Sequence, residues 1–327
     1  MNKMFKIHAI LPTNNEADIL EECLEAASLW ADYIYVFDTG SNDDTWSIVN
    51  RLAENNPKII PYLSEYRPYN FTKTLGEVFS HYFHKSQKGD WWCTLCTDEQ
   101  YLEDPRIFLA KLDSRYDSVW SSTLQYYYTN RDFELFNNSN PGGKHFYKHS
   151  ERLSWYRNNY SEVRFYKHGP STKKSTLFLQ KNFPKVSPNR IAMQHFQFRT
   201  PQQIIKRVRS RQKIFDGDPL MQFAHEKFWK LGSDGKQRVE LSTSLFKDSN
   251  DLTDSEILNL RMVPEVLLHQ DLKNGKYKFE PDLLPQLPIH WSEPILMLKS
   301  LIKAHSRLFI TRFKNFIGFV IIRIRKY

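Results

Sequence analysis

The stretch YIYVFDTGSNDDTW, residues 33–46, joins a run of β-favouring residues to a run of small polar ones. The first run ends abruptly at Asp38, and Gly40 then permits a sharp turn of the backbone. An aspartate at a strand end can direct its carboxylate at base N–H groups or sugar hydroxyls. The alternative is an ordinary Asx-turn followed by a helix that Asp43 or Asp44 caps. The stretch therefore predicts either a ligand-binding strand end or a simple capped turn.

Strand-like and helix-like patterns alternate around this stretch over roughly the first 105 residues. Besides the strand at 33–38, we expect strands at 5–11, 57–63 and 90–102, and helices at 20–30, 43–56 and 70–86. Such alternation predicts an α/β fold, a parallel sheet wrapped by helices. Ligands of these sheets bind beyond the carboxyl ends of the strands. Residues 12–16, 38–45 and 98–99 are therefore expected to converge on one rim.

Composition limits the other classes of protein. The 327 residues suit one large domain, or one domain with an appendage. The only cysteines are Cys23, Cys93 and Cys96, too few for a disulfide scaffold and typical of a reducing cytosol. The C-x-x-C at 93–96 lies in a strand pattern without a second pair, which favours structural cysteines. The N-terminal apolar run is too short for a signal peptide, and no run of about 18 apolar residues predicts a spanning helix. A cytoplasmic location is expected.

Charge is unevenly distributed along the chain, whose net charge is +9. Residues 1–143 hold 12 Lys or Arg and 21 Asp or Glu, whereas residues 144–213 hold 17 and 2. The basic segment is expected either to meet an anionic partner, such as phosphate or a membrane surface, or to form a solvated face. Within it, one exposed side of a helix that starts near Pro201 is expected to carry Lys206, Arg207, Arg209 and Arg211. We expect no nucleic-acid partner, because the first half is acidic and RNA-binding motifs are absent.

Four motifs in order resemble those of the family 2 glycosyltransferases, which are nucleotide-diphospho-sugar transferases with the GT-A fold. They are LPTNNEADIL at 11–20, VFDTGSNDDTW at 36–46, YNFTKTLGEVF at 69–79 and LCTDEQY at 95–101. A fifth, MQHFQFRTPQQIIKRVRSR at 193–211, resembles a stretch found in a bacterial subgroup of the family. The resemblance covers roughly residues 5–230. It implies a Rossmann-like, mostly parallel mixed sheet flanked by helices.

The resemblance also implies a donor pocket for a nucleotide-diphosphate sugar at the rim. Its expected members are Pro12, Asn15, Glu16, Asp38, Gly40, Ser41, Asp43 and Arg199. Asp38 would hold the base or ribose, and Arg199 would face the diphosphate. Asp98 would ligate a divalent metal, Mn²⁺ or Mg²⁺, that bridges the diphosphate. His195 would be a further ligand or, alternatively, a satisfied interior histidine.

Two positions depart from the family pattern. Cys96 stands where the family has the first carboxylate of its metal motif, and Leu75–Gly76 stand where it usually has an Arg-Asn pair. Both changes remove charged groups that the chemistry would use. A catalytically inactive nucleotide- or glycan-binding module is therefore the alternative function.

An inverting transferase needs a carboxylate that deprotonates the acceptor hydroxyl. Between Glu134 and Asp216 the chain offers only Glu151 and Glu162. Glu162 precedes the strand-like VRFYK and is the candidate general base. The alternative is that Glu162 pairs with a neighbouring arginine, such as Arg164 or Arg157.

The chain is expected to divide into a GT-A domain at 1–230, an irregular and partly helical connector at 231–294, and a basic amphipathic helix at 295–327. The helix has 8 basic and no acidic residues over 294–327, which suits an anionic membrane surface, or its apolar stripe packs on the protein. We therefore expect a metal-dependent, inverting glycosyltransferase acting on a glycan or lipid-linked sugar in surface polysaccharide or glycolipid synthesis. It would be peripheral on the inner face of the plasma membrane.

Overall fold

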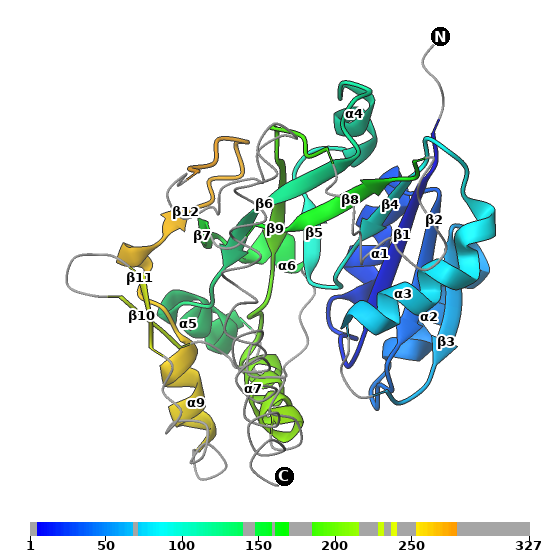
Figure 1. Cartoon of the computed structure of the whole chain (residues 1–327). Coiled ribbons are helices and arrows are strands. Elements are labelled where there is room, and N and C mark those ends of the chain that lie inside the picture. The colour runs from blue at the N-terminus through cyan, green and yellow to red at the C-terminus, as the bar shows by residue number, and fades with distance from the viewer. Residues whose placement is uncertain are drawn as a thin grey trace, which may run out of the picture.

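The computed structural model describes residues 5–67, 71–139, 148–158, 161–169, 185–215, 228–231, 237–240 and 253–279. Strands and helices alternate through the first part of the chain, as predicted (Figure 1). These elements are β1 (Ile7–Thr13), α1 (Leu20–Trp30), β2 (Tyr33–Asp38), α2 (Thr45–Asn55), β3 (Ile59–Ser64), α3 (Phe71–Tyr82), β4 (Trp91–Thr94), β5 (Glu99–Tyr101) and α4 (Pro105–Ala110).

Strands and short helices make up the described part of the second half. They are β6 (Ser118–Tyr126), α5 (Asn130–Ser139), α6 (His149–Arg152), β7 (Trp155–Asn158), β8 (Val163–Lys167), β9 (Ile191–His195), α7 (Pro201–Phe215), β10 (Phe228–Leu231), β11 (Gln237–Glu240), α9 (Asp254–Arg261) and β12 (His269–Gln270). Two 3₁₀ turns, Phe83–Lys85 and Glu265–Leu267, complete the described elements.

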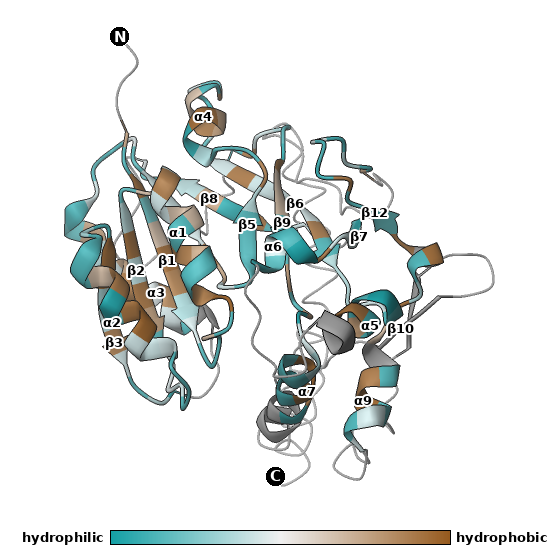
Figure 2. Ribbon diagram, turned by 180° about the vertical axis from the view of Figure 1, so that it is seen from behind, coloured by the Kyte–Doolittle hydropathy of each residue, from teal (hydrophilic) through white to brown (hydrophobic). Residues whose placement is uncertain are grey.

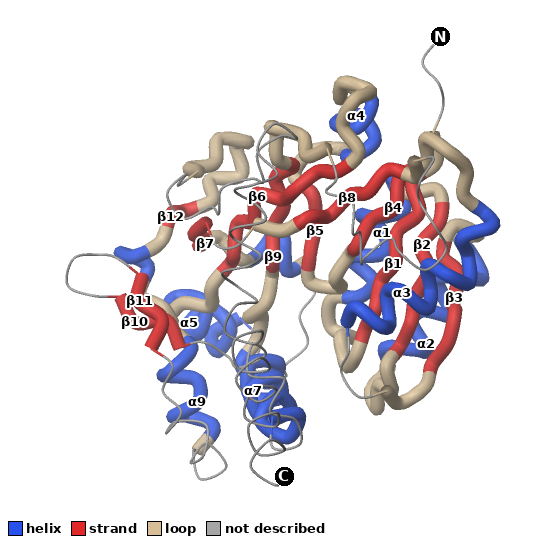
Figure 3. The backbone as a smooth tube through the Cα atoms, in the orientation of Figure 1, coloured by secondary structure: helices blue, strands red, loops and turns tan. Residues whose placement is uncertain are grey.

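A single twisted sheet joins the two halves. Strands β3, β2, β1 and β4 lie side by side in parallel. β8 then pairs antiparallel with β4, and β6 pairs antiparallel with β8 and β7 and parallel with β9. Figure 3 shows the strands continuing from β3 towards β12, with helices on both sides of the parallel part. The predicted fold class, a mixed α/β sheet with a parallel core, is confirmed, and each described antiparallel pair includes at least one strand of the second half.

Alternation along the strands places an apolar layer on each face of the parallel core. Ile7, Ala9 and Leu11 of β1 belong to a cluster that α1 and α2 cover. Ile10 belongs to the cluster on the other face, which α3 covers with residues such as Phe79. Figure 2 shows hydrophobic residues along β1 and β2, whereas β5 and α6 are mostly hydrophilic. The polar strand β5 therefore lies outside the apolar parallel core.

His8 lies in the aromatic layer under α3, where burial determines its charge. Its ring stacks on Trp92, with the centroids 4.6 Å apart, and its Nδ1 lies 3.0 Å from the hydroxyl of Tyr35. Its Nε2 lies 3.7 Å from a carboxylate oxygen of Asp90. Burial lowers the pKa of His8 to about 4, although Asp90 and Asp32 favour the protonated ring. His8 is therefore neutral in the fold at neutral pH.

The strand predicted at 90–102 is interrupted. β4 ends at Thr94, and a turn precedes β5 at Glu99. The backbone N–H of Glu99 donates to the carbonyl of Cys96, and the N–H of Cys96 donates to the Glu99 carboxylate at 3.1 Å. The prediction of one continuous strand was wrong. The turn contains neither glycine nor proline, so the sequence carried no ordinary turn signal there. Its consequence is that Asp98 lies in a loop beyond the carboxyl end of β4.

The described part of the expected connector, residues 253–279, packs on the first domain. Ile257 and Leu258 of α9 enter an apolar cluster with Ile204 and Val208 of α7, and β12 pairs with β7. The boundary at residue 230 stays a prediction, but these residues contribute to the same core as the sheet. The amphipathic helix predicted at 295–327 lies outside the described residues. Within the described ranges, no helix is long and apolar enough to cross a membrane.

Candidate functional site

The Asp38 carboxylate organises the turn that follows β2. It is fully buried and accepts hydrogen bonds from the backbone N–H of Ser41 at 3.0 Å and from the Ser41 hydroxyl at 2.5 Å. The Ser64 hydroxyl, at the end of β3, donates to its other oxygen at 2.7 Å. Gly40 adopts a φ of 96°, as the turn requires. In this arrangement the carboxylate points into the turn. The surface that the expected nucleotide-sugar pocket could use is therefore formed by the turn and not by the carboxylate.

The loop after β1 is fixed to this turn by side-chain hydrogen bonds. The N–H of Asn15 donates to the Ser41 hydroxyl at 2.7 Å, and the N–H of Glu16 donates to the Thr45 hydroxyl at 2.9 Å. In return, the N–H of Asn42 donates to the Asn15 side chain at 2.9 Å. The two rim segments therefore form one unit, with the half-buried Pro12 at the end of β1 beside it.

Asp43 rather than Asp44 provides the carboxylate at the start of α2. Asp44 occupies the N-cap position without a side-chain cap, whereas Asp43 accepts from the N–H of Thr45 at 3.0 Å. Burial alone would raise the pKa of Asp43, but hydrogen bonds from Thr45 and Lys206 outweigh it and hold that pKa below its usual value. Asp38 and Asp43 of the opening motif thus have structural partners.

Asp98 and His195 meet at the same rim. His195 Nε2 lies 3.2 Å from Asp98 Oδ2, and both side chains are about nine-tenths buried. Sheet register explains the contact, because Glu99 pairs with His195 between β5 and β9 and the N–H of Phe196 donates to the carbonyl of Asp98. Burial alone would raise the pKa of Asp98, but His195, Arg207 and Arg199 outweigh it and lower that pKa strongly. Asp98 is therefore a carboxylate at neutral pH.

Arg199 is the buried centre of an ion network. Its guanidinium donates to both oxygens of Asp18 at 2.8 Å, to Glu16 at 2.5 Å and to the carbonyl of Phe196 at 2.9 Å. Burial alone would lower the pKa of Arg199, but Glu16 and Asp18 outweigh it and raise that pKa. Four of its five donors are thus engaged inside the protein. The arrangement fixes Glu16 beside Asp98, and it leaves the predicted contact of Arg199 with a diphosphate as a prediction.

Arg207 of α7 completes the network. Its Nη1 lies 3.9 Å from a carboxylate oxygen of Glu16 and 3.9 Å from Asp98 Oδ2. The side chain is only 14% exposed. The sequence led us to expect Lys206, Arg207, Arg209 and Arg211 on one exposed side of a helix starting near Pro201. The helix starts there, but Arg207 turns inward to the rim, so the expectation was wrong for this residue.

The pair of Asp98 and His195 fits a divalent ion to which the protein gives two ligands. Two ligand atoms at right angles around an octahedral ion, each about 2.1 Å from it, lie about 3 Å apart. The observed 3.2 Å between His195 Nε2 and Asp98 Oδ2 is the length of a hydrogen bond from the ring to the carboxylate, and it is also close to that spacing. A metal would therefore replace this hydrogen bond. Among the described residues, no group of three or more His, Cys, Asp or Glu side chains could hold a metal ion. A metal here would therefore need ligands from a bound diphosphate.

Glu162 lies near the turn that carries Asp98. Among the predicted site residues it has the most exposed carboxylate. Its side chain is 55% exposed and accepts a hydrogen bond from Arg164 at 2.6 Å. This is the arginine pairing that the sequence offered as the alternative role of Glu162. The same Arg164 donates to the buried Glu99 at 2.6 Å. Glu162 therefore joins the turn that carries Asp98 through one arginine, and it remains open to solvent.

The cysteines of the C-x-x-C are free thiols, as expected of structural residues. Cys93 is buried in β4, whereas Cys96 is half-buried in the turn after it. Burial is the main cause that raises the pKa of the Cys96 thiol. The thiol therefore adds no negative charge to the rim at neutral pH, unlike the carboxylate that the family has at this position.

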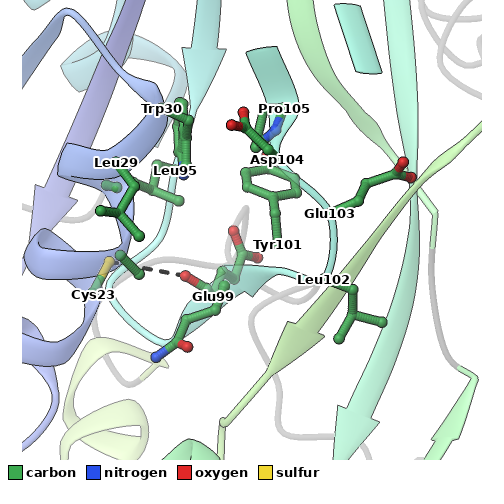
Figure 4. Close-up of a pocket in the computed structure, with 13 residues that line it drawn as sticks. Cys23, Leu29, Trp30, Leu95, Glu99, Tyr101, Leu102, Glu103, Asp104 and Pro105 are labelled. Carbon is green, nitrogen blue, oxygen red and sulfur yellow. Dashed lines mark hydrogen bonds between the residues drawn. The ribbon is translucent and has the colours of Figure 1, made fainter. Parts of the chain in front are cut away.

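A cavity of about 200 Å³, partly open to solvent, lies between α1 and the segment from β5 to α4 (Figure 4). Leu29, Trp30 and Tyr101 give it an apolar lining, and Glu103 and Asp104 lie at its edge. None of the predicted site residues lines it. The rim with Asp98 and His195, and not this cavity, therefore holds the groups that could carry the chemistry.

Comparison with known families agrees with the rim geometry. A family model described as glycosyl transferase family 2 matches residues 9–175, from β1 to beyond β8. The chain belongs to glycosyl transferase family 2. The matched region carries every predicted site residue of this family 2 glycosyltransferase except His195 and Arg199. No curated protein sequence matches the chain.

Solved glycosyltransferase structures resemble it at low identity. The mannosyltransferase PcManGT from Pyrobaculum calidifontis, in complex with GDP-Man and Mn²⁺, is 18% identical with a TM-score of 0.37, covering 64% of this chain and 62% of that one. TarS 1–349 from S. aureus is 12% identical with a TM-score of 0.35, and 66% of each chain is covered. Glucosyl-3-phosphoglycerate synthase from Mycobacterium tuberculosis is 20% identical with a TM-score of 0.24, covering 41% and 48%. The chain thus spans less than two thirds of the length of these structures.

Proposed function

We propose that this family 2 glycosyltransferase moves a sugar from a nucleotide-diphosphate sugar to a hydroxyl acceptor, with a divalent metal and with inversion at the anomeric carbon. The observation that supports it most is the 3.2 Å contact between Asp98 and His195 at the carboxyl-end rim. An oxygen and a nitrogen ligand at this spacing suit Mn²⁺, and Mg²⁺ less well because it prefers oxygen. When bound, the metal neutralises the charge that develops on the diphosphate leaving group.

The donor would lie across the two joined rim loops. In this proposal the turn at Gly40 and Ser41, held by the buried Asp38, shapes the subsite for base and ribose. Asn15 and Glu16 hold the neighbouring loop against it. The diphosphate would extend from there towards Asp98, so its oxygens complete the metal's ligands. This placement gives Asp38 a positioning role rather than a direct contact.

Glu162 would accept the proton of the acceptor hydroxyl. The acceptor oxygen then bonds to the anomeric carbon as the bond to the diphosphate oxygen breaks on the opposite face, which inverts the configuration. The exposure of the Glu162 carboxylate and its link through Arg164 to Glu99 support this assignment. Arg164 holds the carboxylate in place through a hydrogen bond of 2.6 Å.

The acceptor is proposed to be a glycan or a lipid-linked sugar, in surface polysaccharide or glycolipid synthesis. The support comes from the sequence alone. Residues 294–327 include 8 basic and no acidic residues, and apolar residues recur among the basic ones at helical spacing. Such a segment would hold the enzyme peripherally on the anionic inner face of the plasma membrane.

A catalytically inactive nucleotide- or glycan-binding module is the second candidate. Two observations favour it: Cys96 replaces the first carboxylate of the motif, and Arg207 and Arg199 already balance charge at Asp98. In such a module, nucleotide would bind without metal and without turnover.

Calorimetry with UDP and with GDP, each in Mn²⁺ and in EDTA, separates the two candidates. The enzyme predicts that metal and nucleotide each tighten the binding of the other, by linkage. Asp98→Asn keeps the shape, removes the charge and should abolish both this coupling and any hydrolysis of the donor. Equal nucleotide affinity in Mn²⁺ and in EDTA would refute the metal-dependent enzyme and favour the module.

A further inference from the structure

Tyr66 exposes a large aromatic ring at the carboxyl-end rim. It lies in the loop that follows β3, and the residue is 78% exposed. The other large apolar residues exposed in the described part of the chain lie on helices, in the second 3₁₀ turn or after β12. A single exposed apolar residue means little by itself. Tyr66 is different because its backbone is fixed against the turn at 38–41.

The backbone of Tyr66 is held against this turn by its neighbours on both sides. The N–H groups of residues 65 and 67 donate to the carbonyls of Asp38 and Thr39, at 3.0 and 3.3 Å. A Cβ built on Gly40 would lie 2.6 Å from the Cα of Tyr66 and 3.0 Å from its Cβ. The side chain of Tyr66 therefore leaves the backbone in contact with the Gly40 turn.

The side chains before and after Tyr66 gather on the face of the sheet that α3 covers. Arg67 Nη2 lies 2.9 Å from the Glu65 carboxylate, and its Nη1 lies 3.0 Å from the carboxylate of Glu77 on α3. The Arg67 guanidinium also lies 5.7 Å from the ring centroid of Phe37, which belongs to the cluster under α3. Because side chains alternate along an extended chain, the Tyr66 ring is directed away from α3.

The turn beside this ring offers polar groups but no apolar surface. Its residues 39–45 read TGSNDDT. The Asp38 carboxylate is engaged by Ser41 and Ser64, and the N–H of Asn42 donates to Asn15. A nucleobase presents polar edges and two flat faces, and stacking of such a face on an aromatic side chain is a main source of affinity where proteins bind bases. Tyr66 supplies the flat surface that the turn lacks.

We propose that Tyr66 stacks on the nucleobase of the donor. This inference rests on the proposed function, which places base and ribose at Gly40 and Ser41. One face of the base would lie on the ring, while the polar groups of the turn meet its edges. Every base has a face that can stack, so the ring would give affinity without selecting the base. The choice of base would then depend on the polar groups of the turn.

Tyr66→Ala tests the stacking without disturbing the loop, because it keeps the backbone and the Cβ that pack on Gly40. Substitutions of exposed side chains usually have little effect on folding. Calorimetry in saturating Mn²⁺, with whichever of UDP and GDP the wild type binds, should show an affinity at least about fivefold weaker. Tyr66→Phe keeps the ring and loses only the hydroxyl, so its affinity should stay within about twofold of wild type.

Inorganic pyrophosphate is the matched ligand control, because it keeps the diphosphate and has no base. In saturating Mn²⁺ its affinity for Tyr66→Ala should stay within about twofold of wild type. Phe279→Ala is the control variant. It removes another exposed ring, 45% exposed and in the segment after β12, and nucleotide affinity should again stay within about twofold. A thermal unfolding curve for each variant shows that the fold persists.

The inference is overturned if Tyr66→Ala weakens nucleotide binding less than about fivefold, or if pyrophosphate binding weakens with it, as it would after loss of the loop structure. An equal loss in Tyr66→Phe would assign the effect to the hydroxyl and would also overturn the stacking. Failure of the metal-dependent enzyme looks different, because wild-type protein would then bind nucleotide equally in Mn²⁺ and in EDTA. The comparison of Tyr66 variants decides the stacking in either buffer. Wild-type protein that binds neither UDP nor GDP would overturn both proposals.

Discussion

Gly40→Ala should destabilise the rim, because the backbone at Gly40 leaves no room for a side chain. A Cβ at this position would lie 2.6 Å from the Cα of Tyr66 and 3.1 Å from its N, both backbone atoms that cannot rotate away. The φ of 96° adds backbone strain for any residue with a Cβ. Left-handed strain costs about 1–2 kcal/mol, and overpacking costs about 1–3 kcal/mol. We expect the free energy of unfolding to fall by about 2–5 kcal/mol.

The clash acts on residues 65–67, which are hydrogen-bonded to the start of the turn at 38–41. The N–H of Glu65 donates to the carbonyl of Asp38 at 3.0 Å, and the N–H of Arg67 donates to the carbonyl of Thr39 at 3.3 Å. Tyr66 lies between these two bonds, so moving its backbone away from Gly40 loosens both. Nucleotide affinity should therefore fall with stability. Urea unfolding followed by circular dichroism gives the free energy, and calorimetry with UDP and GDP gives the affinity.

Gly76→Ala is the matched control with the opposite sign. Gly76 lies within α3, and a Cβ there would meet no atom within 4 Å. Alanine favours a helix interior over glycine by about 0.5–1 kcal/mol, so this variant should be more stable by that amount. The reasoning is refuted if Gly40→Ala unfolds within about 0.5 kcal/mol of wild type, or if the two variants shift stability in the same direction.

Further predictions concern charge, chemistry and the tail. The pKa of His8 is about 4 in the fold against 6.5 in the unfolded chain, so the free energy of unfolding should fall as pH drops below 6.5. Urea unfolding should show that His8→Gln removes about 2 kcal/mol of the difference between about pH 7.5 and about pH 5; an unchanged difference would contradict it. Glu162→Gln should lower kcat about 100-fold or more while nucleotide affinity stays, and steady-state kinetics with undiminished kcat would exclude it as the base. Removing residues 295–327 should abolish sedimentation with anionic liposomes; loss of the thermal transition would instead show core packing. Cys96→Asp should tighten binding of Mn²⁺ measured by calorimetry and lower the melting temperature without metal; unchanged metal binding would show that this position does not face the ion.

The convergence of the rim segments could be predicted from the sequence, because the periodicity of apolar residues locates the strand ends and parallel strands end at the same edge of the sheet. Residues 12–16 and 38–45 end neighbouring parallel strands, and their hydrogen bonds follow directly from that order. Asp98 lies at the same rim because β4 pairs with β1 on the other side. Local patterns were enough for these statements, since each concerns where a strand ends.

The ion network could not be predicted in the same way. Arg199 and its partner Glu16 are 183 positions apart, and no period in the sequence relates them. The inward direction of Arg207 depends on how α7 rotates against the sheet, which the packing of Ile204 and Val208 with α9 determines. A helix with several basic residues looks exposed in sequence because the carboxylates that receive one of them lie in distant segments.

The loss of the first carboxylate and the inward arginine can be understood as one balance of charge. Three carboxylates, Glu16, Asp18 and Asp98, face two guanidiniums at the rim. A fourth carboxylate at position 96 would add negative charge that only a resident metal could offset. With an uncharged thiol there, Arg207 is enough to keep the rim close to neutral before the donor binds. A metal that arrives with a diphosphate brings further anionic oxygens with it, so Cys96 is compatible with the proposed donor site, which takes its metal together with the nucleotide.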